Sequence, residues 1–231
     1  MEIYAAFNSD GVSVLISDAD LNDAAAGNAP LSAELADAAA QARCTDLIDN
    51  LRASLDGDDR TRKLAAAKAL LALDDRAAVS LLESLADTET DTVVAKSFRA
   101  VATRMRGPQA AAELFADPDT DPQLARLLVS NYNSHLRPEF GDIRFLVVAL
   151  GHYFDRSLPW LATLRADLWD NGVYLILAAL SNDIAVRLLR EERGAAERMR
   201  LLHLLDLLTD HPGDDDIAAD AASLRAVLSA D

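Results

Sequence analysis

The chain has few of the features that mark secreted or membrane-spanning proteins. It contains a single cysteine, Cys44, so it cannot form a disulfide within itself. Its longest uninterrupted apolar run, residues 173–180, is far shorter than the roughly 20 residues that a membrane-spanning helix needs. The first ten residues include acids and no basic residue, unlike a secretory signal. We therefore predict a cytoplasmic protein that does not enter a membrane.

Helix breakers and aromatic residues are also scarce. The 231 residues include 9 Gly and 7 Pro, and only 5% are aromatic, whereas 51% are hydrophobic and most of these are Ala or Leu. Ala and Leu favour helices, and this apolar content is higher than a disordered chain carries. The length suffices for a sizeable core. These features predict an all-α fold.

Positive charge is lacking at both ends of the chain. The net charge is −16; residues 1–59 hold 12 acids and 2 bases, residues 60–204 hold 19 of each, and residues 205–231 hold 7 acids and 1 base. Nucleic acid is not an expected partner, because phosphates need a positive surface. A basic protein is the expected partner, because the electrostatic field of the acidic ends steers cationic molecules toward the chain. Solubility or a high-salt habitat is the alternative explanation of the acidic ends.

The motifs that mark catalytic, cofactor and metal sites are missing. The sequence has no HExxH, CxxC, GxGxxG, GxSxG or phosphate-binding GxxxxGK[ST] pattern. The acids of residues 117–122 have the spacing of a calcium loop, but Pro122 replaces the required Gly and Leu128 the required Glu. Cys44 lies on an apolar helix face, where a core residue is expected. We predict no catalytic residue, no cofactor and no metal.

An internal repeat runs through the middle of the chain. Leu55, Leu85 and Phe115 lie 30 residues apart, and each is followed by an acidic turn that opens an apolar helix. Apolar residues in these helices recur every three or four positions. Shorter helices, with starts marked by Asp75 and by Gly107-Pro108, separate them. The acids of the turns, including those at 56–59, are predicted to end one helix and to cap the next.

One repeat unit, SLDGDDRTRKLAAAKALLALDDRAAVSLLESL, resembles a HEAT repeat of the short bacterial type. The shared features are the acidic turn, the basic residue Arg62, the Ala-rich AAAKAL, the following Asp, and AAV-x-LL-x-x-L. The resemblance is strongest over residues 47–115 and weak from 116 to 136. It implies a right-handed superhelix of stacked antiparallel helix pairs. Because most members of that family bind other proteins, it also implies a protein-binding function.

Three regions follow from these patterns. Residues 1–30 are predicted to form a β-hairpin around NSDG that caps the first helices, with residues 20–30 as a linker; a helix plus loop is the alternative. Residues 31–136 are the HEAT-like repeats, and Pro30 is expected to start their first helix. Residues 137–231 are expected to be irregular helices packed on the same solenoid, where they either continue the superhelix or fold over as a small bundle. Their expected bounds are 142–154, 159–169, 172–190 with a break at 181–183, 194–210 and 215–229.

Aromatic residues concentrate in one segment. Eight of the chain's 12 lie between residues 132 and 174, interspersed with Arg. Interfaces favour Trp, Tyr and Arg, so this segment is a candidate partner-binding surface. The alternative is that these rings fill the core where the regular stack changes direction. The candidate partner-binding residues are Tyr153, Arg156, Trp160, Arg165, Trp169 and Tyr174.

Together these patterns favour a non-enzymatic protein–protein interaction module. Its partner is expected to be a basic protein, and its role that of an inhibitor of the immunity-protein type or of an adaptor. The alternative is a HEAT-like enzyme, a DNA glycosylase or a lyase, that uses the aromatic segment at Trp160 and Trp169. The sequence carries no signal for an oligomeric state.

Overall fold

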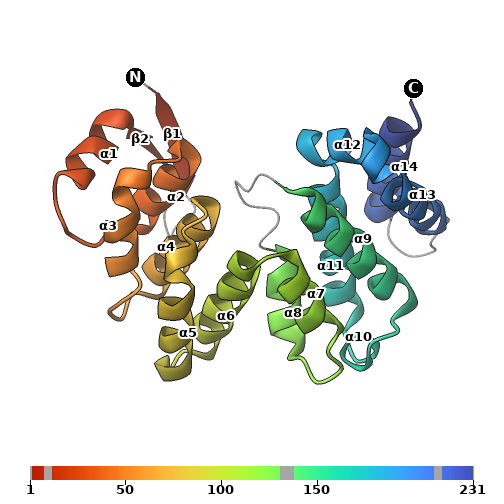
Figure 1. Ribbon diagram of the computed structural model, residues 1–231, viewed down its shortest axis with the longest axis horizontal. Coiled ribbons are helices and arrows are strands. Elements are labelled where there is room, and N and C mark those ends of the chain that lie inside the picture. The colour runs from red at the N-terminus through yellow and green to blue at the C-terminus, as the bar shows by residue number, and fades with distance from the viewer. Residues whose placement is uncertain (1, 8–11, 131–137, 211–214, 231) are drawn as a thin grey trace. The chain divides into compact units, whose positions relative to one another are not determined.

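The protein is an all-α structure with one small β-hairpin near its N-terminus, which confirms the predicted fold class (Figure 1). The computed structural model describes residues 2–7, 12–130, 138–210 and 215–230. Its contacts divide the chain into two compact units. The first unit ends at Arg106 and the second begins at Gly107, so the boundary falls inside the region predicted to hold the repeats.

The N-terminal strands β1 (Ile3–Phe7) and β2 (Ser13–Ser17) pair in antiparallel register. Tyr4 and Ala6 lie opposite Ile16 and Val14, and these alternate residues turn toward the first helices. The hairpin therefore forms as one of the two predicted alternatives, with its inner face packed on helix α2 (Ala33–Ala42). The turn predicted at Asn8–Gly11 lies outside the described residues.

The predicted linker at residues 20–30 is wrong in its first half, because Asp18–Ala25 form helix α1. A capping box starts this helix: Ser17 Oγ accepts the amide of Asp20, and the Asp20 carboxylate accepts the amide of Ser17. Helix α2 then starts at Ala33 after the cap Ser32, rather than at Pro30.

The segment between α1 and α2 is held in place by two buried polar side chains. One lies in helix α3 (Ile48–Ala53) and the other directly follows it. Asn50 Nδ2 donates to the carbonyl oxygens of Gly27 and Ala29, and Ser54 Oγ accepts the amide of Leu31 at 2.7 Å. Backbone groups that the loop would otherwise leave unpaired are thereby satisfied.

The rest of the first unit repeats one helix pair. After α2 come η1 (Thr45–Leu47), α3, α4 (Arg60–Ala72), η2 (Arg76–Ala78), α5 (Val79–Thr88) and α6 (Thr92–Arg106). The longer helices stack in the order α2, α4, α6, while α3 packs on α4 and α5 on α6. One continuous apolar core runs between them. Stacking of this kind buries a helix face that no single pair could bury alone.

The turns show that the repeat begins at α2. Arg43 and Asp74, 31 residues apart, both adopt left-handed backbone conformations after a long helix, and a short 3₁₀ helix follows each. The predicted caps at the acidic turns are confirmed for Asp59, which accepts the amide of Arg62, and for Asp91, which accepts that of Val93.

Asp75 does not cap as predicted. Its side chain makes no cap hydrogen bond to η2 and instead accepts two hydrogen bonds from the guanidinium of Arg52, at 2.9 and 2.6 Å. Asp75 is buried, and the paired cation offsets the cost of burying its charge. Arg52 lies on α3, so this contact joins two consecutive repeats.

The second unit is organised around α9. Helix α9 (Phe140–Asp155) packs against α7 (Pro108–Ala116), α11 (Ala166–Leu180), α12 (Asp183–Arg190) and α13 (Ala195–Thr209). The other elements are α8 (Pro122–Ser130), α10 (Pro159–Ala162), η3 (Glu192–Gly194) and α14 (Asp215–Ser229). Whether these helices continue the superhelix or form a separate bundle stays a prediction.

Of the predicted C-terminal helices, one break is confirmed and one helix is wrong. The break at 181–183 is confirmed, because Asn182 caps α12 by accepting the amide of Ile184. The single helix expected at 159–169 is wrong: α10 ends at Ala162, and α11 starts only after the extended residue Arg165. In the described part of the chain no one helix has the length and apolarity of a bilayer span; α11 and α12 pass that test only as a pair bent by 70°.

Candidate partner-binding surface

Three of the six predicted partner-binding residues lie in the core of the second unit. Tyr153, Trp160 and Trp169 are buried. The Trp160 ring meets Phe115 edge to face at 5.1 Å between centroids, and Trp169 Nε1 donates to the carbonyl oxygen of Tyr153. These rings fill the core, as the alternative interpretation of the aromatic segment expects. Neither indole presents a face on which a base could stack.

The other three predicted residues are exposed. Arg156 follows α9 and lies over the Trp169 ring at 5.2 Å, and Arg165 pairs with Asp167 at 2.8 Å. Tyr174, 49% exposed, lies nine residues further along the chain than Arg165, roughly 13 Å along a helix. Their role in partner binding stays a prediction.

Metal-binding geometry is not found in the described residues, where His, Cys, Asp and Glu form no group of three or more that could hold an ion. The acids of the former calcium-loop candidate serve the local backbone: Asp121 caps α8 by accepting the amide of Gln123, and Asp117 accepts that of Asp119. Cys44 is half-buried against the core of the first unit.

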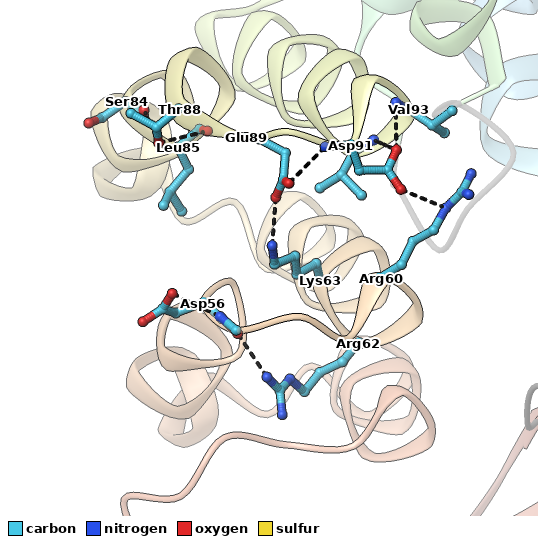
Figure 2. A network of polar contacts seen from close by, with 12 residues as sticks. Asp56, Arg60, Arg62, Lys63, Ser84, Leu85, Thr88, Glu89, Asp91 and Val93 are labelled. Atoms are coloured by element: carbon cyan, nitrogen blue, oxygen red, sulfur yellow. Dashed lines mark hydrogen bonds and ion pairs between the residues drawn. The ribbon is translucent and has the colours of Figure 1, made fainter.

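The cations near the start of α4 are engaged by acids of the next repeat. Figure 2 shows Lys63 and Arg60 pointing toward Glu89 and Asp91, the two acids of the turn before α6. Lys63 Nζ lies 2.6 Å from Glu89 Oε2, and Arg60 Nε lies 3.6 Å from Asp91 Oδ2. Arg62, in turn, donates to the backbone oxygen of Asp56. The two ion pairs join α4 to the next repeat, whereas the Arg62 contact joins α4 only to the turn before it.

A groove of about 420 Å³ lies between α2 and α4. Alanines form much of its wall, and its polar rim mixes one acid, Asp37, with the cations Arg60 and Lys68. Small side chains let the two helices approach closely. The charged rim of this groove is mixed, with one acid and two cations.

A second groove, of about 550 Å³, lies beside the hairpin and has a different character. Strand β2, helix α1 and the first turn of α2 enclose it. Its apolar walls are Val14, Ile16, Ala24 and Leu35. Its charged residues are all acids: Asp20, Asp23 and Glu34. We call these three acids and the four apolar residues the hairpin groove.

The acids of the hairpin groove lie in a stretch of the chain that holds no cationic side chain. Residues 1–42 contain seven acids and no Lys, Arg or His. Asp20 binds Ser17, which lowers its pKa through hydrogen bonds from the Ser17 hydroxyl and amide. Asp23 and Glu34 make no ion pair within the described residues. Their field acts outward, on whatever approaches the groove.

Sequence reasoning missed this groove, although one signal for it was available. The absence of cations from residues 1–42 marks a surface whose acids cannot be neutralised locally. The apolar walls could not be foreseen, because they depend on how β2, α1 and α2 pack.

Comparison of the chain with protein-family models, with curated proteins and with solved structures finds no match. The HEAT-like resemblance of residues 47–115 therefore stays a prediction.

Proposed function

We propose that the protein is a non-enzymatic cytoplasmic binding module whose partner is a basic protein. The observation that carries this proposal is the hairpin groove, in which Asp23 and Glu34 stand unpaired beside apolar walls in a region without cations. Several acids further along the unit are paired with cations, as Asp75 is with Arg52 and Glu89 with Lys63. Unpaired acids around an apolar groove suit a cationic ligand with an apolar component.

Two roles fit such a module. As an inhibitor of the immunity type it would cover the working surface of a basic protein, and the acidic field would speed capture. As an adaptor it would hold a basic protein without altering its activity. The repeats would in either case supply a firm support, since salt bridges and a continuous core join them.

The test is affinity capture from a lysate of the source organism with the full-length protein. Asp23→Lys/Glu34→Lys is compared with Asp58→Lys, which alters an exposed acid outside the groove that makes no recorded contact. We expect a basic protein to bind the wild type and Asp58→Lys, to be lost from the double variant and to be released as salt rises. Capture of acidic or neutral proteins alone, or of none, would contradict the proposal.

Inhibitor and adaptor are then separated by assaying the captured protein. An inhibitor abolishes the activity of its partner at equimolar ratio, and an adaptor leaves that activity unchanged.

A further inference from the structure

The hairpin has an outer edge that nothing in the described structure covers. The amide of Asp18 donates to the carbonyl oxygen of Glu2, so these two residues form a hydrogen-bonded pair. Such pairs alternate along an antiparallel ladder with pairs whose backbone groups point outward. By this alternation the amides and carbonyls of Ile3 and Ala5 point away from β2, and those of Ser13, Leu15 and Ser17 point away from β1.

The Ala5 carbonyl on the outer edge of β1 has a partner, and so has the Ser17 amide at the end of β2. Gln41 Nε2 donates to the carbonyl oxygen of Ala5 at 2.9 Å, and the Asp20 carboxylate accepts the amide of Ser17 at 2.8 Å. Both contacts agree with the outward direction inferred from the register. For Ser13 and Leu15 no partner outside the hairpin is recorded among the described residues. The middle of β2 therefore offers an open strand edge.

The hairpin groove lies on the same side as this open edge. Val14 and Ile16, the inward-facing residues of β2, form part of its wall, and no β1 residue lines it. On the opposite, outer face, Leu15 is 66% and Ile3 55% exposed. A chain laid along β2 would point alternate side chains into the acidic groove and onto this apolar face.

We propose that β2 binds an extended segment of a partner protein as a third strand, and that this segment alternates basic with apolar residues. Main-chain hydrogen bonds to Ser13 and Leu15 would hold it. Its Lys or Arg side chains would lay their apolar stems on Val14 and Leu35 and bring their charges to Asp23 and Glu34. Its apolar side chains would cover Leu15 and Ile3. The inference rests on the proposed function and names the mode of binding.

Charge excludes a second copy of this chain as the natural occupant. Pairing β2 with β2 of another molecule would bring together two regions that each hold seven acids and no Lys, Arg or His. Like charges brought close in this way oppose association. A cationic segment meets the same field with the favourable sign.

The probe is a fluorescein-labelled peptide that alternates Lys or Arg with Val, titrated into the full-length protein by fluorescence anisotropy. Two matched peptides serve as controls. In one, alternate backbone nitrogens on the edge that would face β2 are methylated, which leaves every charge in place. In the other, Glu replaces each basic residue.

We expect the basic peptide to bind, and methylation to weaken binding by about tenfold or more, because it removes backbone hydrogen bonds worth about 1 kcal/mol each. Asp23→Lys/Glu34→Lys should cost a similar factor, and Asp58→Lys far less. Asp23→Asn/Glu34→Gln replaces the lysine variant if that one does not fold. Amide exchange of Leu15 should slow with the unmodified peptide only.

Three results would overturn the inference: no binding of the basic peptide, equal affinity for the methylated peptide, or equal weakening by Asp58→Lys. Equal affinity for the methylated peptide would mean that charge alone attracts it. If a basic protein is captured from lysate while the peptide fails these tests, binding of a basic partner stands and the strand-addition mode falls.

Discussion

Lys63 Nζ lies 2.6 Å from Glu89 Oε2, and this ion pair joins the first turn of α4 to the turn that precedes α6 (Figure 2). Both side chains are largely buried, with 13% and 10% of their surfaces exposed. Glu89 also accepts the amide of Asp91, which in turn caps α6. The acidic turn is thus part of the connection between repeats.

The first prediction concerns Lys63→Met. The change leaves the Glu89 carboxylate without its cation in a largely buried position, so we expect the free energy of unfolding to fall by roughly 1–3 kcal/mol. Lys68→Met is the matched control, because Lys68 lies on the same helix, is exposed and has no recorded ion pair. It should change stability by less than about 0.5 kcal/mol. Equal effects in urea denaturation would show that the pair does not stabilise the fold.

The second prediction concerns pH. The Lys63 ammonium and, after it, the amide of Asp91 hold the pKa of Glu89 below its ordinary value of 4.5. Because the folded-state pKa is lowered, the stabilisation is complete above the unfolded-state pKa and is lost as pH falls through the folded one. The difference in unfolding free energy between wild type and Glu89→Gln should therefore be constant near neutral pH and shrink below about pH 4.5. A difference that does not change with pH would contradict this.

The third prediction tests the caps that define the repeat. Asp59→Ala and Asp121→Ala each remove a side chain that accepts the amides at the start of a helix, so each should cost about 0.5–2 kcal/mol. Asp58→Ala removes a neighbouring exposed acid with no recorded contact and should be nearly neutral. If all three variants unfold alike, the acids act through general charge rather than as caps.

These caps were foreseeable because they are local. A capping acid accepts hydrogen bonds from the backbone amides two or three residues further along the chain. The sequence alone therefore places the acid beside its partners. The capping box of Ser17 and Asp20 is equally local, and α1 was missed only because the Gly and Pro that follow it suggested a linker. By contrast, Asp75 was expected to cap a helix and instead binds Arg52, 23 residues away. That outcome depends on how the repeats stack, which no local pattern encodes.

The same distinction explains the aromatic segment. Periodicity predicted α9 but not the break between α10 and α11. The choice between core and interface depends on which faces α7, α9 and α11 turn toward one another. Trp160 and Trp169 proved to be core, while the hairpin groove, which has no aromatic residue, emerged only from the packing of β2, α1 and α2.

The fourth prediction concerns the close approach of α11 to Tyr153. A Cβ on Gly172 would lie 2.3 Å from Tyr153 Cε1, far inside van der Waals contact. Gly172→Ala should therefore destabilise the protein by roughly 1–3 kcal/mol, as overpacking does. Gly151→Ala is the control: its nearest neighbour, the end of the Arg200 side chain, lies at 3.6 Å. This helical position should gain up to about 1 kcal/mol from the better helix propensity of Ala. Loss of stability in both variants would mean that packing against Tyr153 is not the cause.

The fifth prediction concerns the Tyr153 hydroxyl, which is buried and has no hydrogen-bond partner among the described residues. Burial raises the pKa of this phenol to about 12, so it is neutral at neutral pH. On folding, a buried neutral hydroxyl without a partner loses its hydrogen bonds to water and forms no new ones, which destabilises the folded state. Tyr153→Phe should therefore leave the unfolding free energy unchanged or raise it by about 1 kcal/mol. Tyr174→Phe, on the exposed part of α11, should change nothing. A loss above about 1 kcal/mol for Tyr153→Phe alone would show that the hydroxyl has a bonding partner in the folded protein, such as a buried water.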